Sequence, residues 1–209
     1  MANLYLRQSP LAHLHLDARA VGDAASSSTG IEIGEHRFRH MLNLRGHAKD
    51  AAFGAAVKKA IGCALPQKLN TVYSKSGGPM ILALGPDEWL IVSDDDAGTL
   101  EIKLGKELKG QHAGITAVGE GRTVIKLGGG HARDVLAKGC PLDLHPMAFA
   151  PGQSAQTTLA RTDILLHCLT PGRGKAEVFD IYVARSFAEY AWTWIEDAGR
   201  EHGVRVTMP

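Results

Sequence analysis

The chain has 209 residues, of which 44% are apolar and 22% charged, and its 23 basic and 22 acidic residues give a formal net charge of +1. This ordinary globular composition excludes a disordered or collagen-like chain. The near-zero charge argues against a nucleic-acid binder, which normally carries a basic stripe. No apolar run approaches the ~18 residues that a membrane span needs.

The sequence lacks the common signatures of cofactor binding and nucleophilic catalysis. It has no phosphate-binding loop, no GxGxxG turn, no nucleophile elbow and no HExxH helix. Its three cysteines, Cys63, Cys140 and Cys168, are too few and too scattered for a disulfide framework, which indicates a reducing cytoplasm. We therefore expect no catalytic residue and no cofactor site in this chain.

Residues 1–30 are predicted to form an N-terminal arm. Pro10 and a weak apolar patch precede the small polar run 23–30, which cannot bury enough surface to order itself. Such an arm is either disordered or laid across a partner. For an isolated chain the disordered terminus is the commoner case.

A first module is predicted over residues 31–118, and it combines strands with two helices. Alternating apolar residues indicate the strands, and apolar stripes at helical spacing indicate the helices. In chain order the elements are strand 37–45, with Phe38, His40, Leu42 and Leu44 on one face, helix 48–61, the hairpin strands 80–84 and 88–93, and helix 97–109. The acidic run Asp94–Asp96 is interpreted as a solvated helix cap, with an acid–base cluster as the alternative.

A second module is predicted over residues 119–209 and repeats that order. Its elements are strand 122–127, helix 131–138, the hairpin strands 155–161 and 163–168, strand 176–184 and a last helix. Ser186 and Glu189 predict a capping box for the last helix. The apolar stripe of this helix is predicted to contain Phe187, Tyr190, Ala191, Trp194, Ile195 and Ala198.

Two similar strings suggest an internal repeat. GHAKD at 46–50 and GHARD at 130–134 each open a helix after a strand. A fixed period of this kind is typical of a duplicated unit, but a five-residue match also arises by chance, so both interpretations stay open. Duplication would give two strand–helix–strand–strand–helix modules, an α+β fold with mixed or antiparallel sheets.

The histidine pairs do not predict a metal site. His13 and His15 form an HxH pair, whereas His36 and His40 fall in or beside a strand, too far apart to chelate one ion. Neither pair has a nearby third ligand, although a closed site needs three or four. We therefore expect no metal ion in this chain.

Two other motifs have a structural and a functional interpretation. The run Gly128–Gly130 before a helix fits a tight turn, with an anion-binding nest as the less favoured alternative. Cys140 lies near His145, which could act as its base. Because Pro141 stiffens the segment and no orienting third group is evident, a buried structural cysteine is favoured.

Arg185 and Trp192 are the candidates for binding a ligand or a partner. Arg185 precedes the last helix and either binds an anion or pairs with Glu189 or Asp180. Trp192 lies outside the predicted apolar stripe of that helix. A large aromatic side chain displaced from the core face is a candidate for a protein interface.

Several long strings resemble one known family, the γ subunit of heterotetrameric sarcosine oxidase. The resemblance covers most of the chain and is densest from about Gly121 to Gly203. The strings are SPLA (9–12), GPDEWLIVS (85–93), ARDVLAKGCPLDLHPMAF (132–149), GQSAQTTLAR (152–161) and FDIYVARSFAEYAWTWIEDAG (179–199). Asp143 and His145, which lie in the second-module strings, join Arg185 and Trp192 as interface or pocket candidates.

The resemblance implies a fold like that of the folate-binding aminomethyltransferase of glycine cleavage. It also implies a complex that oxidatively demethylates sarcosine to glycine, with hydrogen peroxide and formaldehyde or 5,10-methylenetetrahydrofolate as products. FAD, FMN, NAD and tetrahydrofolate would be bound in partner subunits, which would be the α, β and δ subunits. The γ subunit itself would be structural and would hold no catalytic residue, cofactor or metal.

Two other functions stay open on the sequence. A free-standing folate-binding or aminomethyltransferase-like protein would need a carboxylate for the pterin ring, for which Glu88, Glu177 and Asp180 are the candidates. The chain could equally be the corresponding subunit of a related N-methyl amine dehydrogenase, because the substrate would be selected by another chain. No nucleic-acid or membrane partner is expected.

Overall fold

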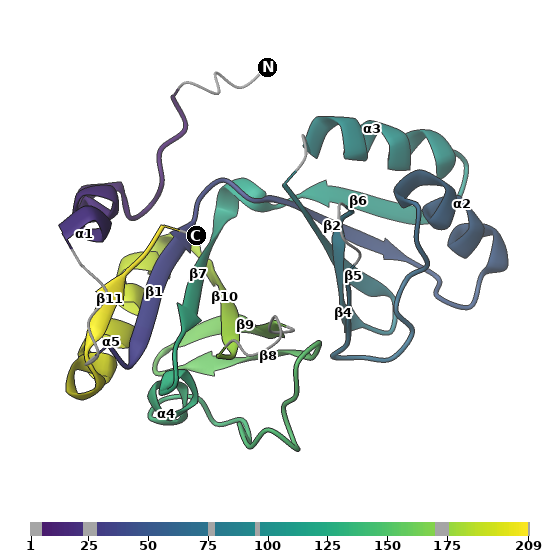
Figure 1. The fold of residues 1–209 in the computed structure, drawn as a ribbon. Helices are drawn as coiled ribbons and strands as arrows, with labels where there is room; N and C mark the ends of the chain where they lie inside the picture. The colour runs from purple at the N-terminus through teal and green to yellow at the C-terminus, as the bar shows by residue number, and fades with distance from the viewer. Residues whose placement is uncertain (1–5, 23–28, 75–77, 95–96, 170–175, 209) are drawn as a thin grey trace. The chain divides into compact units, whose positions relative to one another are not determined.

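The computed structural model describes residues 6–22, 29–74, 78–94, 97–169 and 176–208. The chain divides into two compact units (Figure 1). Unit 1 comprises Met1–Phe38, Gly121–Pro151 and Gln156–Pro209, and unit 2 comprises Arg39–Glu120 and Gly152–Ala155. The chain therefore starts in unit 1, passes through unit 2 and returns to unit 1.

Unit 1 is built on a six-stranded mixed sheet with the strand order β11-β1-β7-β10-β9-β8. Its strands are β1 (Ile31–His36), β7 (Arg122–Gly128), β8 (Ser154–Leu159), β9 (Thr162–Leu169), β10 (Val178–Ala184) and β11 (Val204–Val206). Its helices are α1 (Leu16–Gly22), α4 (Ala132–Ala137) and α5 (Ala188–Gly199), with the short 3-10 turns η2 (Ala12–Leu14), η4 (Arg185–Phe187) and η5 (Arg200–His202). The pair β1–β11 is parallel, whereas β1–β7, β7–β10 and β10–β9 are antiparallel.

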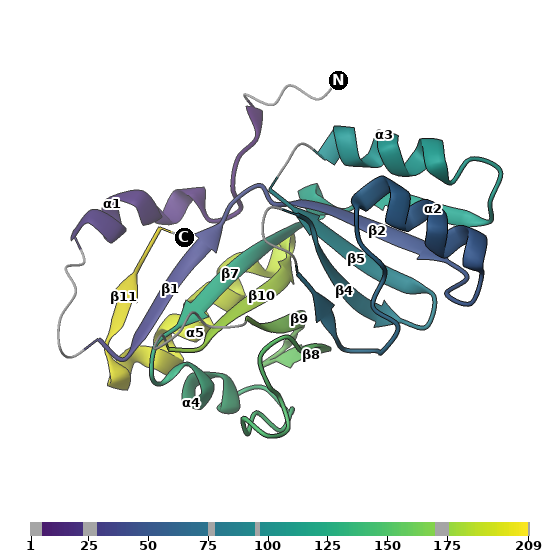
Figure 2. The same cartoon turned by 45° about the vertical axis from the view of Figure 1, so that its right-hand side comes forward.

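Unit 2 is built on a five-stranded sheet with the order β3-β4-β5-β2-β6. Figure 2 shows β4, β5 and β2 of this sheet side by side. Its elements are β2 (His40–Gly46), α2 (Ala51–Ile61), β3 (Val72–Tyr73), β4 (Met80–Gly85), β5 (Glu88–Ser93), α3 (Ala97–Glu107), β6 (Ala113–Ala117) and η3 (Gly119–Gly121). Phe53 of α2 packs 5.9 Å from the Trp89 ring of β5, in a core that also holds Leu104 of α3. Both helices thus bury their apolar stripes against this sheet.

The two units repeat one topology. In unit 2 the order is β2-α2-β3-β4-β5-α3, and the strands lie as β2-β5-β4-β3. In unit 1 the order is β7-α4-β8-β9-β10-α5, and the strands lie as β7-β10-β9-β8. GHAKD and GHARD precede the equivalent helices α2 and α4. The predicted α+β class with mixed and antiparallel sheets is confirmed, and the repeated unit is strand–helix–strand–strand–strand–helix, one strand longer than the strand–helix–strand–strand–helix unit expected for a duplication.

Most predicted elements are present, with ends shifted by a few residues. Helix α2 begins after Asp50, whose carboxylate accepts hydrogen bonds from the backbone N–H groups of Ala52 and Phe53. The hairpin β4–β5 pairs Leu82 with Leu90. The short strands β3, β6 and β11 were not predicted, because none of them has an alternating run long enough to recognise.

Strand β1 was not predicted, and its residues lie in a different module from the expected one. The sequence places residues 31–36 within the first module, 31–118, whereas in the structure β1 pairs with β7 and β11 of unit 1. Phe38, predicted on a strand face with Leu42, lies in the turn between β1 and β2 with φ 59° and is 39% exposed. Ile31 and Ile33 are fully buried, so it is burial in the unit 1 sheet that fixes this strand.

The described part of the N-terminal arm is folded onto unit 1. Leu11 and Leu16 are buried, and the Ser9 hydroxyl donates to the buried Glu35 carboxylate of β1 at 2.5 Å. In this region the prediction of an arm that is disordered or laid across a partner is therefore wrong. The residues 23–28 of the small polar run lie outside the described part of the chain.

Helix α5 buries a different face from the predicted one. Its buried residues are Ala188, Ala191, Trp192, Ile195 and Gly199, while Phe187 and Tyr190 are exposed. The predicted capping box is absent, because η4 precedes the helix and no side chain caps either element. The prediction failed because Ala191 and Ile195 belong both to the predicted apolar face and to the face that is buried. Only packing against the sheet of unit 1 decides which of these two faces points inward.

Candidate functional site

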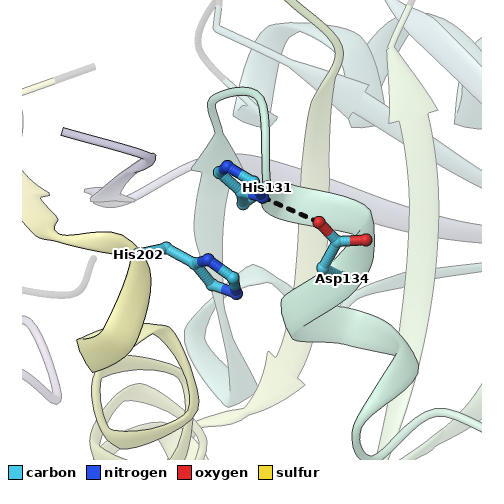
Figure 3. A group of neighbouring side chains, drawn as sticks. All are labelled: His131, Asp134 and His202. Atoms are coloured by element: carbon cyan, nitrogen blue, oxygen red, sulfur yellow. Dashed lines mark hydrogen bonds and ion pairs between the residues drawn. The ribbon is translucent and has the colours of Figure 1, made fainter. Parts of the chain in front are cut away.

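Two histidines and an aspartate meet on unit 1. His131 and Asp134 stand at the start of α4, and His202 ends η5 near the C-terminus of the chain (Figure 3). His131 Nδ1 lies 2.8 Å from Asp134 Oδ2, and the imidazole rings of His131 and His202 stack with centroids 4.3 Å apart and planes at 6°. One ligand atom from each residue lies within 4.8 Å of the others.

The backbone around Gly30 brings the two histidines together. Gly30 N–H donates to the His202 carbonyl at 2.7 Å, and the His131 N–H donates to the Gly30 carbonyl at 3.2 Å. A Cβ at residue 30 would lie 2.4 Å from the His202 carbonyl oxygen and 3.0 Å from His131 Cδ2. Only glycine allows this approach. Gly129, with φ +106°, makes a second close contact, because a Cβ at residue 129 would lie 2.4 Å from the Gly30 carbonyl oxygen.

Charged neighbours surround the His131–Asp134–His202 cluster. Lys138, which follows α4, forms an ion pair with Glu201, whose Oε1 also lies 3.5 Å from His202 Nε2. The hydrogen bond and charge of Lys138, followed by the charge of His202, hold the pKa of the exposed Glu201 below its usual range. The cluster and its neighbours Glu201 and Lys138 thus bring together two imidazoles, two carboxylates and one ammonium group.

Arg133, on α4, makes several hydrogen bonds with its side chain. Its guanidinium binds both oxygens of Glu177 and donates to the backbone carbonyls of Leu144 and Phe149. It also lies 5.2 Å above the Phe179 ring of β10. A planar fork of donors is suited to such a multiple contact, which ties segment 144–149 to α4 and β10.

The pKa directions at Arg133 follow from this geometry. Its hydrogen bonds hold the pKa of Glu177 below the ordinary value, and Glu177 in turn raises the pKa of Arg133. Burial raises the pKa of the nearby Cys168 thiol to about 11, despite the opposing charge of Arg133. Cys168 is therefore a protonated thiol at neutral pH and not a nucleophile.

Trp192 does not lie where the sequence predicted. Its side chain is fully buried in unit 1, and its Nε1 donates to Glu196 Oε2 at 2.7 Å. A buried indole needs such a partner, and Glu196, one helical turn further along α5, supplies it. Because the ring is enclosed, the prediction that Trp192 stands off the core face as an interface residue is wrong.

Arg185 lies in η4 and is exposed. Its Nη2 donates to the backbone carbonyl of Gln8 in the N-terminal arm. The predicted pairing with Glu189 or Asp180 is not formed, since Glu189 pairs instead with His13 at 3.3 Å. Arg185 thus anchors the arm to the segment before α5.

The other candidates of segment 140–150 do not form a catalytic group. The buried Cys140 Sγ lies 3.8 Å from Thr157 Oγ1, so His145 is not its partner. The exposed Asp143 accepts a hydrogen bond from the His145 N–H at 2.9 Å, and His145 Nδ1 accepts one from the Met147 N–H. Both side chains therefore stabilise a turn.

The carboxylates proposed for a pterin ring occupy separate places. Glu177 is held by Arg133, and Glu88 accepts hydrogen bonds from Asn43 and Arg45 in unit 2. Asp180 is fully buried on β10, in register with His167 on one neighbouring strand and Lys126 on the other. These three residues do not line one site within either unit.

Three further sequence features have structural roles. Gly129 makes the close turn described above, in agreement with the tight-turn interpretation of Gly128–Gly130. Asp94 pairs with Arg39 at 3.0 Å, while Asp95 and Asp96 lie outside the described residues. Among the described residues, neither His13 and His15 nor His36 and His40 belong to a group of three metal-binding side chains. The group that does form consists of His131, Asp134 and His202.

The sequence did not indicate the His131–Asp134–His202 cluster, because His202 is distant in the chain and no spacing motif links it to His131. GHARD contains two of the three residues, and Gly203 follows the third, which is the only local signal. None of the described helices is long and apolar enough to span a lipid bilayer.

The fold defines the general class of protein first. The chain superposes on the glycine cleavage system aminomethyltransferase T from Bartonella henselae with a TM-score of 0.69 and 14% identity, over 97% of this chain and 59% of that one. At this identity the likeness shows an aminomethyltransferase-like fold, which agrees with the repeated α+β units.

The particular family follows from closer relatives. The model of the sarcosine oxidase gamma subunit family matches residues 45–201. Sarcosine oxidase subunits gamma from Corynebacterium sp. (strain P-1) and from Arthrobacter sp. are 32% and 33% identical, each over 94% of this chain and 91% of its own length. A chain of the heterotetrameric sarcosine oxidase from Corynebacterium sp. U-96, in complex with pyrrole 2-carboxylate, superposes with a TM-score of 0.81 at 30% identity, over 94% of this chain and 96% of that one. The chain therefore belongs to the sarcosine oxidase gamma subunit family.

Proposed function

We propose that this chain is the non-catalytic structural subunit of a flavin-dependent heterotetrameric sarcosine oxidase. The supporting observation is its likeness, over nearly the full length of both chains, to a chain of a heterotetrameric sarcosine oxidase. The chain would hold the larger subunits in place through its folded α+β units. A standard interface of about 1,600 Å² suffices for such a role.

The complex would oxidise the N-methyl group of sarcosine and release glycine and hydrogen peroxide. The one-carbon unit would leave as formaldehyde or as 5,10-methylenetetrahydrofolate. FAD, FMN, NAD and tetrahydrofolate would be bound by partner subunits, designated α, β and δ, in the cytoplasm. This chain's own residues would contribute stability and shape.

The bonding of the candidate residues is consistent with a structural role. Arg133 and Glu177 form an ion pair, and Arg185 donates to the backbone of the N-terminal arm. The Cys168 thiol, with a pKa of about 11, is protonated at neutral pH. Groups that take part in catalysis usually have a pKa near the working pH and a reachable substrate. Neither the Arg133–Glu177 ion pair, nor Arg185, nor Cys168 combines a pKa near neutral pH with a position open to a substrate.

The aminomethyltransferase-like fold supports a second candidate, a folate-binding protein. That function would require an accessible carboxylate with unsatisfied acceptors for the pterin donors, whereas Glu177 and Glu88 are both engaged by arginine and Asp180 is fully buried. Isothermal titration of the full chain with tetrahydrofolate separates the two candidates. The structural role predicts no saturable heat, whereas one equivalent of bound folate would contradict it.

Co-expression tests assembly directly. The full chain, with an affinity tag at its C-terminus, is expressed together with the other subunits of the oxidase and purified. We expect a yellow complex with flavin absorbance that oxidises sarcosine. Recovery of the tagged chain alone, under conditions where the other subunits are abundant, would contradict the proposal.

A further inference from the structure

The His131–Asp134–His202 cluster has no part in the proposed structural function, and it brings metal-binding side chains together from distant segments. We propose that these three residues form a surface site for a zinc-like divalent cation. The site lies wholly within unit 1, so it does not depend on a partner chain.

The donor set favours a transition metal over magnesium or calcium. Two imidazole nitrogens and one carboxylate oxygen are the ligands that suit Zn²⁺, whereas Mg²⁺ and Ca²⁺ prefer oxygen alone. Three protein ligands leave a fourth position for water, as in zinc sites that are not closed. The three ligand atoms already lie within 4.8 Å of one another, so turning the side chains without moving the backbone would bring them to one ion.

The backbone fixes the two histidines relative to each other. Gly30 binds the main chain of both through its N–H and its carbonyl, and any side chain at this position would separate them. Preorganised ligands lose little entropy when an ion binds. The closeness of the His131 and His202 main chains is therefore a property of the fold.

Solvent and charge also permit an ion to bind. The side chains of His131 and Asp134 are 50% and 62% exposed, which leaves a path from solvent. The buried Nε2 of His202 has no hydrogen-bond partner among the described residues. Glu201 adds a carboxylate beside His202 and neutralises the ammonium group of Lys138.

Binding must change the arrangement of the rings. In the structure the two imidazoles are stacked with nearly parallel planes, whereas histidines on one ion direct in-plane lone pairs at it. One ring therefore has to turn out of the stack, and the hydrogen bond between His131 and Asp134 has to open. The nitrogen resonances of both imidazoles should shift when the metal is added.

The test uses the full chain without a histidine tag and Zn²⁺ alone as the probe. Isothermal titration should give one equivalent of bound Zn²⁺, and Co²⁺ should give a visible absorption band typical of low coordination number. His202→Gln and Asp134→Asn should each weaken binding at least about tenfold. Asp134 is exposed, so its variant keeps the test valid if His202→Gln fails to fold.

A matched control comes from unit 2. His47 and His112 form another histidine pair, with ring centroids 6.0 Å apart, but no third ligand joins them among the described residues. His112→Gln should bind Zn²⁺ as tightly as the unaltered chain. Absence of saturable binding would overturn the proposal. So would binding that His202→Gln and Asp134→Asn leave unchanged, or binding that His112→Gln abolishes.

Discussion

The guanidinium of Arg133 and the carboxylate of Glu177 meet at two points, with Nη2 donating to Oε1 at 2.7 Å and Nε donating to Oε2. The same guanidinium donates to the carbonyls of Leu144 and Phe149. One side chain of α4 therefore connects the residue before β10 to the segment that follows the helix. Few other contacts can replace it, because a single planar group satisfies four acceptor atoms.

Replacing Arg133 by lysine should destabilise the chain by about 2–3 kcal/mol, because an ammonium group cannot make the forked contact and leaves half-buried acceptors unpaired. Urea denaturation of the full chain measures this loss. The control is Arg200→Lys, since Arg200 pairs with Asp197 on the surface with both side chains well exposed. That variant should lose less than about 0.5 kcal/mol. Equal losses in the two variants would contradict the role assigned to Arg133.

The same ion pair predicts a dependence of stability on pH. Arg133 holds the pKa of Glu177 below the ordinary 4.5, so the unfolded chain takes up a proton before the folded chain does. The stabilisation is fully present above pH 4.5 and is lost as the pH falls through the lower, folded-state pKa. The free energy of unfolding should fall more steeply with acidification in the unaltered chain than in Glu177→Gln. Parallel curves for the two proteins would show that the pair does not contribute.

The cysteines should be inert in the folded protein. Cys63, Cys140 and Cys168 are buried thiols that form no disulfide, and burial raises the pKa of Cys168 to about 11. Thiol reagents react with the thiolate, so Ellman's reagent should label none of the three at neutral pH in native protein and all three in denaturant. Rapid labelling of Cys168 in the native state would contradict its burial.

Local patterns sufficed for the elements whose stabilising contacts lie near in sequence. Helix α2 has its cap at Asp50, and the hairpin β4–β5 has its turn between adjacent strands, so both were predicted. Strand β1 was missed because it contains Glu35, a charged residue that the sequence alone does not indicate to be buried. The hydroxyl groups that donate to the Glu35 carboxylate belong to Ser9 and Thr123, which come from distant segments.

Long-range packing also decided the candidate sites. Either Trp192 or Trp194 could face inward on α5, and the sheet of unit 1 selected Trp192. The hydrogen-bond partner of the Trp192 indole, Glu196, is only four residues away in the sequence. Because a buried indole needs such an acceptor, this spacing is a local signal that favours burial of Trp192. His131 and His202, by contrast, meet through Gly30, and no pattern in the sequence predicts that meeting.

The arm provides another comparison of buried and exposed groups. Ser9 donates to the buried Glu35 carboxylate, which also accepts from Thr123 Oγ1 at 2.7 Å. Ser9→Ala should cost about 1–3 kcal/mol of unfolding free energy, because it removes one donor from a buried carboxylate. Ser186→Ala should change stability by less than about 0.5 kcal/mol, since no side chain caps η4 or α5. A loss of about 1 kcal/mol at Ser186 would instead indicate a working capping box.

Assembly with and without this chain tests the structural role most directly. The remaining subunits of the oxidase are co-expressed in the presence or absence of the 209-residue chain, and light scattering after size exclusion gives the mass of the flavin-containing species. We predict that the chain is part of the flavin-containing complex, and that its omission lowers the mass and the yield of active oxidase. A flavoprotein of unchanged activity and stability that forms without this chain, together with a chain that elutes alone, would contradict the account.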